Sequence, residues 1–418
     1  MTYLSEVVGV VGVGTMGAGI AQLALEAGHP VWIHDVDAAA IERGRARIKG
    51  GLERRAGRLD LDLDSAAVWV AARYAALHDS ATLDDLASAG PLLVVEAALE
   101  DLEAKRSIFQ ALDANTPPTA ILATNTSALP VASIAAATRH PGRVVGLHFF
   151  NPAQVMPLVE VIATTVADPS VLDRATALVT TWGKVPVRCR DTPGFIVNRV
   201  NRPFTLEALA ILGAGRGSVE GIDEAMRSEG FPMGPFELMD LVGLDINLAA
   251  ARGVFAGSVE AGDPSADRFR PSPIQERLVA DGRLGRKTGE GFYRYDDGGR
   301  RIGPAGDFAA AHGAGDPGDH GDPGDPGDHG DHGDRLDDVA IADRITIAIV
   351  NEAYRAASEG VATPADIDLA MRLGASHPSG PFERGTALGG PAAVFARLRA
   401  FASEGPRFDP APSLVDPA

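Results

Sequence analysis

The stretch VVGVVGVGTMGAGIAQLALEAG, residues 7–28, decides the fold of this chain. Residues 7–13 form a valine-rich run typical of a buried strand, and the alanine- and leucine-rich residues after the turn are typical of a helix. The turn GVGTMG places Gly12, Gly14 and Gly17 where a tight bend, close approach of a ligand to the backbone and close helix packing require glycine. Free N–H groups at the start of such a helix bind phosphate. The sequence therefore predicts a dinucleotide-binding loop.

An acidic residue at the end of the next apolar run identifies the dinucleotide. Asp35 lies in PVWIHDV, residues 30–36, about 20 residues after the glycines, where a carboxylate hydrogen-bonds the hydroxyl groups of the adenosine ribose. The same carboxylate would repel the 2′-phosphate of NADP. We therefore expect NAD as the cofactor, bound by Gly12, Gly14, Thr15, Met16, Gly17 and Asp35.

Apolar runs separated by helical stretches continue up to residue 190. Near-continuous β-branched runs that alternate with helices indicate a parallel sheet with both faces covered. From DTPGFIVNR on, the pattern becomes helical. The expected fold is an α/β Rossmann-type doubly wound sheet, residues 1–190, followed by an all-α domain, residues 191–296. Strands are expected at residues 7–13, 30–36, 92–98, 120–126, 143–150 and 156–162.

The composition then changes to a run dominated by glycine, aspartate and proline, GDPGDHGDPGDPGDHGDHGD. Repeated aspartates repel one another and provide nothing to bury, so residues 297–336 are predicted to be a disordered linker. His320, His329 and His332 lie within it, but such a segment offers no preformed site, and we expect no metal.

The chain beyond the linker repeats the first helical unit. When Arg344 is aligned on Arg199, no gap is needed until IDLAMR matches IDEAMR, and one inserted residue then aligns the two GPFE segments. Residues 337–418 are therefore predicted to be a second copy of the all-α domain. This copy is degenerate, because Asp343 occupies the place of Asn198.

Composition excludes several classes of protein. The 418 residues carry a formal net charge of -18, which disfavours nucleic acid and anionic membranes as partners. The only cysteine, Cys189, excludes an internal disulfide and fits a reducing compartment. No apolar run approaches the roughly 18 residues of a membrane span, and the first residues lack the features of a signal peptide. We expect a cytoplasmic protein.

Polar side chains follow the apolar runs at the points where ligands bind in open α/β sheets. His148 lies in GLHFFNP and Glu160 in MPLVEVI, so two strands can bring imidazole and carboxylate side by side. Histidine can take the proton of a secondary alcohol near neutral pH, and a carboxylate behind it fixes the tautomer and stabilises the imidazolium. Ser127 and Asn198 are candidate hydrogen-bond donors to the substrate oxygen. Taken singly, each has another explanation: a core histidine, an ion-paired glutamate, a polar turn at TNTS.

Together these motifs resemble the L-3-hydroxyacyl-CoA dehydrogenase family. The resemblance rests on GVGTMGAGIAQ, TNTSALP, GLHFFNPAQVMPLVEVI, DTPGFIVNR, FPMGPFELMDLVGLD and GRKTGEGFYRY, in this order over residues 7–295. It implies reversible NAD-dependent oxidation of a 3-hydroxyacyl-CoA, such as 3-hydroxybutyryl-CoA or 3-hydroxyadipyl-CoA, to the 3-ketoacyl-CoA, in fatty-acid or phenylacetate-type catabolism. The family's catalytic positions are matched by Ser127, His148, Glu160 and Asn198, and its NAD-contacting positions by Glu100, Lys105, Asn151 and Lys287.

The resemblance has two departures. Ala128 replaces a serine that family members usually carry, and the lysine-rich CoA-binding stretch of the family reads IKGGLERRAGRLDLD. A solvated helix face is the alternative reading of this stretch. The CoA phosphates are expected to contact Lys49, Arg54, Arg55 and Arg58. In the family the helical domain forms a homodimer, so we expect a homodimer or an intramolecular pseudo-dimer in which the second copy packs on the first.

Two rival functions remain at this point. One is a non-catalytic NAD-binding relative, which would be free to lose the polar set around His148. The other is a dehydrogenase of a free hydroxy or sugar acid, which would have no use for the basic residues 49–58 or for the repeated helical unit.

Overall fold

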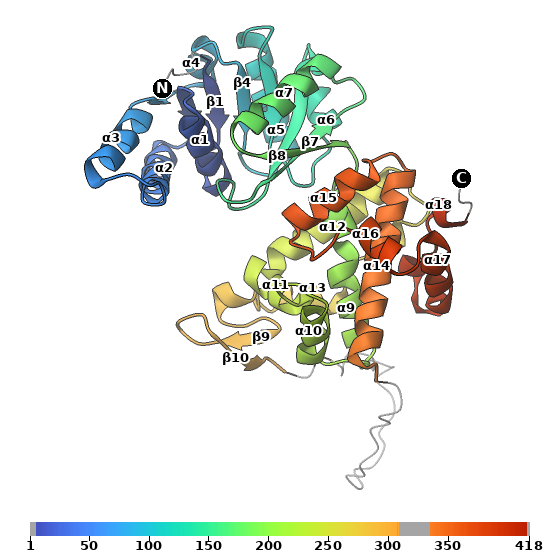
Figure 1. Ribbon diagram of the computed structural model, residues 1–418. Helices are drawn as coiled ribbons and strands as arrows, with labels where there is room; N and C mark the ends of the chain where they lie inside the picture. Colours follow the sequence, from blue (N-terminus) through green and yellow to red (C-terminus); the bar gives the residue numbers. More distant parts are fainter. Residues whose placement is uncertain (1–5, 307, 309–334, 416–418) are drawn as a thin grey trace, which may run out of the picture. The chain divides into compact units, whose positions relative to one another are not determined.

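The computed structural model describes residues 6–306, 308 and 335–415 (Figure 1). The chain divides into two compact units, one ending at Ile196 and one beginning at Val197. The division follows shortly after the predicted boundary at residue 190. Within the described ranges, no helix is both long and apolar enough to cross a membrane.

The first unit is built on an eight-stranded sheet with the order β3-β2-β1-β4-β5-β6-β7-β8. Its strands are β1 (Val8–Val11), β2 (Val31–His34), β3 (Leu77–Asp79), β4 (Leu93–Glu96), β5 (Ile121–Thr124), β6 (Val144–Phe149), β7 (Leu158–Ala163) and β8 (Val185–Arg190). All neighbours from β3 to β6 pair in parallel. The strand order reverses between β1 and β4, and ligands bind at such a point in open α/β sheets. The predicted Rossmann-type sheet is confirmed.

Two features of the sheet differ from the prediction. Strand β7 pairs antiparallel with β6, so the sheet is not wholly parallel. The loop between Phe149 and Leu158 is too short for the crossover that a parallel neighbour requires. Strands β3 and β8 were not predicted. β3 has only three residues, and β8 is an edge strand that carries Pro186 and exposed arginines, a composition typical of edges.

Helices connect and cover the strands of the first unit: α1 (Thr15–Ala27), α2 (Ala38–Ala56), α3 (Leu63–Tyr74), α4 (Leu83–Ser88), α5 (Leu102–Asn115), α6 (Val131–Ala135), the single 3-10 turn η1 (Pro141–Arg143) and α7 (Pro169–Thr181). Helices α1 and α7 pack against the sheet in one apolar cluster, in which Ile20 and Leu178 join strand residues such as Val10 and Val161 (Figure 1). Helices α4, α5 and α6 contact one another in sequence and pack on β2, β5 and β6.

The second unit is mainly helical and contains both predicted helical segments. The first segment comprises α8 (Val197–Val200), α9 (Arg202–Gly213), α10 (Val219–Ser228), α11 (Pro235–Val242), α12 (Leu244–Glu260), η2 (Ala266–Phe269), α13 (Pro273–Ala280) and η3 (Arg286–Thr288). The second comprises α14 (Asp338–Ser358), α15 (Pro364–Gly374), α16 (Pro381–Ala387), α17 (Pro391–Ala400), η6 (Ala402–Glu404), η7 (Pro406–Phe408) and α18 (Pro412–Val415). Helix α14 packs along α9 and α10, so the two segments share one core (Figure 1).

The predicted start of the linker at residue 297 is wrong. Strands β9 (Tyr293–Tyr295) and β10 (Arg301–Pro304) form an antiparallel hairpin that crosses this boundary. Gly298 and Gly299 lie in the turn between these strands, and a glycine-rich turn between two short strands is a hairpin signal. The rest of the predicted linker, with His320, His329 and His332, lies outside the described residues.

Each GPFE motif begins a helix. In α11, the side chain of Glu237 accepts the N–H of Gly234, and Asp223 accepts the N–H groups of Phe236 and Glu237. In α16, Glu383 accepts the N–H of Gly380, and Asp368 accepts those of Phe382 and Glu383. The first four N–H groups of a helix have no partner within the helix, so these carboxylates satisfy groups that would otherwise be buried without a bond. The repeated motif is therefore a helix start.

Candidate active site

The glycine loop joins β1 to α1 at the point where the strand order reverses. Gly12 has a φ of +86°, and a methyl group there would lie 2.7 Å from the backbone of Ala98. A methyl group on Gly17 would lie 1.8 Å from the carbonyl oxygen of Gly12. At Gly14, by contrast, no protein atom lies within 4 Å of that position. Two of the glycines are thus required by packing, and the third leaves backbone open on the ligand side.

The start of α1 suits an anion. Its N-cap is Gly14, which provides no side-chain bond to the first turn, and that turn contains no acidic residue. The free N–H groups and the positive end of the helix dipole are therefore available to a phosphate. Asp35 follows β2 directly, and its Oδ2 accepts the N–H of Val13 at 2.8 Å. The carboxylate predicted to bind the ribose thus also fixes the loop.

Two neighbouring strands place a histidine against a glutamate. His148 on β6 and Glu160 on β7 are direct partners in the antiparallel register, and His148 Nδ1 lies 2.6 Å from Glu160 Oε2. The other carboxylate oxygen accepts the N–H of Ile196 at 3.0 Å. Both residues are buried, and the imidazole packs against Phe150 and Phe195. Because Nδ1 faces the carboxylate, Nε2 is the nitrogen that can exchange a proton with a ligand.

A buried ionic cluster holds the loop that carries Ser127. Oε1 of Glu100 accepts the hydroxyl of Thr126 at 2.6 Å and the N–H of Ser127 at 2.9 Å. Lys105 lies 3.3 Å from Glu100 and 2.7 Å from Glu96, which is fully buried at the end of β4. Burial opposes ionisation of Glu100, but Lys105 and the hydrogen bonds outweigh it and lower the pKa of this carboxyl. The cluster therefore keeps an ionised acceptor beneath Ser127.

Two residues of this site were not predicted. Glu96 pairs with Lys105 and accepts the hydroxyl of Thr124 at 2.7 Å; its signal was a lone acidic residue at the carboxyl end of LLVVEAA. Lys184 donates to the carbonyl oxygens of Ala153 and Met156, at 2.6 and 2.8 Å. It thereby fixes the loop between His148 and Glu160, and burial lowers the pKa of Lys184 to about 8. No residue pattern around Lys184 indicates this contact.

A basic pocket lies in the first unit between α1, α2 and the loop before β7. Its volume is about 400 Å³, and Arg54, Arg55 and Arg58 line it together with Lys184. Glu26 is the acidic residue of the lining, and Arg55 Nε lies 3.6 Å from it. Three of the four predicted CoA contacts thus gather at one pocket. Lys49 is not part of its lining, and its ammonium lies 6.0 Å from the centre of the Tyr74 ring.

The remaining predicted residues lie on two different units. Asn151 is exposed in the loop between β6 and β7 of the first unit. Asn198 lies on α8 of the second unit, where its carbonyl oxygen accepts Arg202 Nε at 2.9 Å. Lys287, also in the second unit, forms an ion pair with Asp245 at 2.6 Å.

A dinucleotide loop and a buried histidine–glutamate pair on one Rossmann-type sheet define a dehydrogenase that uses a nicotinamide cofactor. The family model for the NAD binding domain of 3-hydroxyacyl-CoA dehydrogenase matches residues 7–192. The model for the C-terminal domain of 3-hydroxyacyl-CoA dehydrogenase matches residues 194–295 and 341–415. The chain therefore belongs to the 3-hydroxyacyl-CoA dehydrogenase family, and NAD is its cofactor.

Known proteins resemble the chain over most of its length. A 3-hydroxyadipyl-CoA dehydrogenase of Escherichia coli is 35% identical over 445 residues, covering 92% of this chain and 91% of that protein. The mitochondrial hydroxyacyl-coenzyme A dehydrogenase of Rattus norvegicus is 42% identical, covering 68% of this chain and 90% of the rat protein. A crystal structure of a 3-hydroxybutyryl-CoA dehydrogenase from Escherichia coli K12 has a TM-score of 0.80 and 32% identity and covers 98% of each chain.

Proposed function

We propose that this protein catalyses the reversible NAD-dependent oxidation of an L-3-hydroxyacyl-CoA to the 3-ketoacyl-CoA. The observation that carries the proposal is the 2.6 Å contact between His148 and Glu160 in a chain of this family. In the oxidation, His148 Nε2 accepts the proton of the substrate hydroxyl, and Glu160 stabilises the resulting imidazolium. In the reduction, the same imidazolium returns the proton. Ser127 and Asn198 donate hydrogen bonds to the substrate oxygen as charge develops on it.

The residues present suit the cofactor. NAD, when bound, accepts the hydride from the alcohol carbon. Its pyrophosphate would lie over Gly14 and the uncapped start of α1, and Asp35 would hold the adenosine ribose. Further contacts are assigned to Glu100, Lys105, Asn151 and Lys287.

The acyl-CoA substrate is proposed to place its phosphates at the basic pocket of the first unit. Arg54, Arg55 and Arg58 line that pocket, so local positive charge is available despite the acidic composition of the chain. A dehydrogenase of a free hydroxy acid would have no use for such a pocket. Lys49 is assigned a peripheral contact at most. The proposed location of the enzyme is the cytoplasm.

Replacement of the dyad tests the reaction. His148→Asn or Glu160→Gln should lower kcat for 3-hydroxybutyryl-CoA by at least about 100-fold, because the base or its orienting group is lost. Binding of NADH, measured by fluorescence titration, should be unchanged. Asp173→Asn, which removes an exposed ion-pair partner of Arg188 on the same unit, is the matched control. Near-normal turnover of both dyad variants would refute the mechanism.

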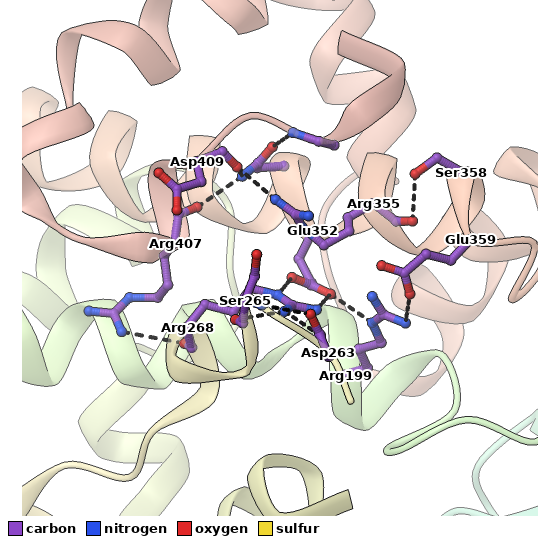
Figure 2. A network of polar contacts seen from close by, with 12 residues as sticks. Arg199, Asp263, Ser265, Arg268, Glu352, Arg355, Ser358, Glu359, Arg407 and Asp409 are labelled. Atoms are coloured by element: carbon purple, nitrogen blue, oxygen red, sulfur yellow. Dashed lines mark hydrogen bonds and ion pairs between the residues drawn. The ribbon is translucent and has the colours of Figure 1, made fainter. Parts of the chain in front are cut away.

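The second helical segment is proposed to be a degenerate copy of the first. Arg199 donates to Glu352 at 2.7 Å, and Arg344 donates to Glu207 at 2.6 Å (Figure 2 shows the first of these contacts). In the alignment of the two segments, Arg199 corresponds to Arg344 and Glu207 to Glu352. The two ion pairs are therefore one contact made twice with the partners exchanged. Such reciprocity is the property of an interface with two-fold symmetry.

Each of these glutamates has a second arginine. Arg268 donates to Glu352 at 2.7 Å, and Arg407 donates to Glu207 at 2.5 Å. Each arginine precedes a buried phenylalanine, Phe269 or Phe408, on a short 3-10 turn. These contacts support an intramolecular pseudo-dimer, in which the copy covers the first helical segment. Asp343, at the position of Asn198, is ion-paired with Arg397 of its own segment, which argues against a second site.

A further inference from the structure

One buried cation of the second unit has no carboxylate partner among the residues that the structure describes. Arg202 begins α9, one helical turn after Asn198, and only 4% of it is exposed. Its Nε donates to the carbonyl oxygen of Asn198 at 2.9 Å, and its Nη1 lies 3.5 Å from that of Asn247. Both acceptors are neutral. Burial lowers the pKa of Arg202 to about 10, still high enough for the guanidinium to be charged near neutral pH.

The other buried arginines of this unit interact with carboxylates. Arg199, Arg268 and Arg344 each pair with a buried glutamate. Arg355 donates to the carbonyl oxygens of Asp409 and Pro410, but it also interacts electrostatically with Glu352, Glu359 and Asp263. A buried charge without a counterion costs several kcal/mol even after the protein relaxes, so such groups are normally paired. Arg202 is therefore the exception that needs a reason.

Packing does not supply that reason. In the alignment of the two helical segments, Arg202 corresponds to Ile347, which is fully buried in an apolar cluster of the second segment. In the second segment, to which no substrate contact is assigned, an apolar side chain therefore packs at the equivalent helix position. The guanidinium occurs only in the copy that carries Asn198.

We infer that Arg202 binds a carboxylate at the far end of the acyl chain, so that the preferred substrate is a 3-hydroxyacyl-CoA with a terminal carboxylate, of which 3-hydroxyadipyl-CoA is the example. This inference rests on the proposed function, in which Asn198 contacts the oxygen on the third acyl carbon. A guanidinium presents two parallel N–H donors to a carboxylate, and that carboxylate would supply the missing counterion.

The spacing fits a six-carbon chain. The N–H of Asn201 donates to the carbonyl oxygen of Val197, so the backbone stays helical between Asn198 and Arg202. Side chains four residues apart on a helix are neighbours. In a 3-hydroxyadipyl chain, the carboxylate lies three carbon atoms beyond the carbon that bears the hydroxyl. It is therefore within reach of a side chain one turn beyond Asn198.

The test compares two substrates of equal length. We expect the unaltered protein to have a kcat/KM for 3-hydroxyadipyl-CoA at least about 10-fold above that for 3-hydroxyhexanoyl-CoA, which lacks the carboxylate. Arg202→Met should reduce this ratio by about 10- to 100-fold, the value of a charge-assisted hydrogen bond, mainly through the KM of the adipyl substrate. Arg202→Lys should retain part of the preference. Arg252→Met, which removes an exposed arginine of α12, should leave the ratio unchanged.

Several outcomes would overturn the inference. Equal losses with both substrates would mean that Arg202 acts only through its bonds to the carbonyl oxygens of Asn198 and Asn247. Absence of a preference for the adipyl substrate in the unaltered protein would also overturn it. So would equal inhibition of the unaltered protein by adipyl-CoA and hexanoyl-CoA, a measurement that requires no variant. Inactivity of the unaltered protein on every 3-hydroxyacyl-CoA would instead refute the proposed function.

Discussion

Glu100 links the expected cofactor region to the loop that presents Ser127. One of its oxygens accepts four donors from that loop: the hydroxyls of Thr126 and Ser127 and the N–H groups of Ser127 and Ala128. An amide at this position could accept through its oxygen, but it could not carry the charge that Lys105 compensates at 3.3 Å. The carboxylate is therefore expected to position Ser127 in addition to any contact with NAD.

Glu100→Gln should lower kcat at saturating NAD by about 10- to 100-fold, because the loop loses a charged acceptor and Ser127 is no longer fixed. The measurement is steady-state turnover with the concentrations of NAD and acyl-CoA varied separately. Glu103→Gln, on the exposed first turn of α5 just after Glu100, serves as the control and should leave kcat within about 2-fold of its normal value. An effect confined to the KM for NAD would show that Glu100 contacts only the cofactor.

His377 should make the second unit sensitive to acid. Burial and the charge of Arg384 lower the pKa of His377 to about 3, whereas an unfolded histidine titrates near 6.5. Below pH ~6.5, His377 binds a proton in the unfolded chain but stays neutral in the folded chain. The free energy of unfolding therefore falls as the pH falls towards 3. Between pH ~6.5 and ~5, protonation of this residue in the unfolded chain should lower the free energy of unfolding by about 1.5 kcal/mol.

Chemical denaturation followed by circular dichroism at these two pH values measures the effect. His377→Gln retains a donor to Asn201, which lies 2.9 Å from His377 Nε2, and should reduce the dependence on pH. His78→Gln, at an exposed position of the first unit, should not. An unchanged pH dependence in the His377 variant would contradict the assignment.

At the level of residues, the sequence predicted the His148–Glu160 contact from two neighbouring apolar runs. It did not predict the partners of Lys105 or the carbonyl contacts of Lys184. Glu96 is only nine residues from Lys105, but the two lie on different elements, and the residue types do not show how the loop between them folds back. Lys184 bonds to backbone oxygens, which every residue type carries. Spacing therefore predicts a pair on adjacent strands but not a buried ionic cluster.

The antiparallel direction of β7 brings His148 and Glu160 into contact. Residues directly opposite in an antiparallel ladder have Cβ atoms about 5 Å apart, so a histidine and a glutamate there meet without a crossover helix between them. The sequence predicted the two strands within a few residues but gave them the wrong relative direction. The short loop after Phe149 carried the missing information, because only an antiparallel turn fits it.

The helix starts at the GPFE motifs should depend on their aspartates. Asp368→Ala removes the acceptor of two N–H groups of α16 and should lower the free energy of unfolding by about 2–3 kcal/mol. Asp223→Ala should cost about 1 kcal/mol more, because Asp223 also accepts the hydroxyl of Tyr293 at 2.7 Å. Asp366→Ala, which alters only the exposed cap of α15, is the control. Equal and small losses in all three variants would contradict the proposed role of the motif.

At the scale of the whole molecule, the sequence predicted a sheet domain, a helical domain and a repeat of the latter. Composition and periodicity are sufficient for this, because each domain class has its own pattern of apolar residues. Composition and periodicity do not show that the two helical segments share one core. The shared core is seen only in contacts such as Arg199–Glu352 and Glu207–Arg344. These ion pairs join residues more than a hundred positions apart and connect two sides of the predicted linker.

The reciprocal ion pairs predict how the protein would behave without its last segment. A chain that ends after Gly306 keeps the β9–β10 hairpin but loses α14 to α18. Glu207 is fully buried and would lose both of its arginines, Arg344 and Arg407, while Arg199 would lose Glu352. Removal of one partner of a buried ion pair typically costs 3–5 kcal/mol. Binding of a second molecule that supplies new partners for these charges should therefore be favourable. A second truncated chain offers one, because Arg199 and Glu207 are the counterparts of Arg344 and Glu352.

We therefore expect the truncated chain to form a dimer and the full chain not to dimerise through this face, with molar mass measured by light scattering. Glu207→Gln should weaken the truncated dimer, because Arg199 of each copy would then face a neutral amide. Glu220→Gln, on the exposed first turn of α10, should leave the dimer intact. A truncated chain that remained a monomer of unchanged stability would show that the second segment is not the partner of the first.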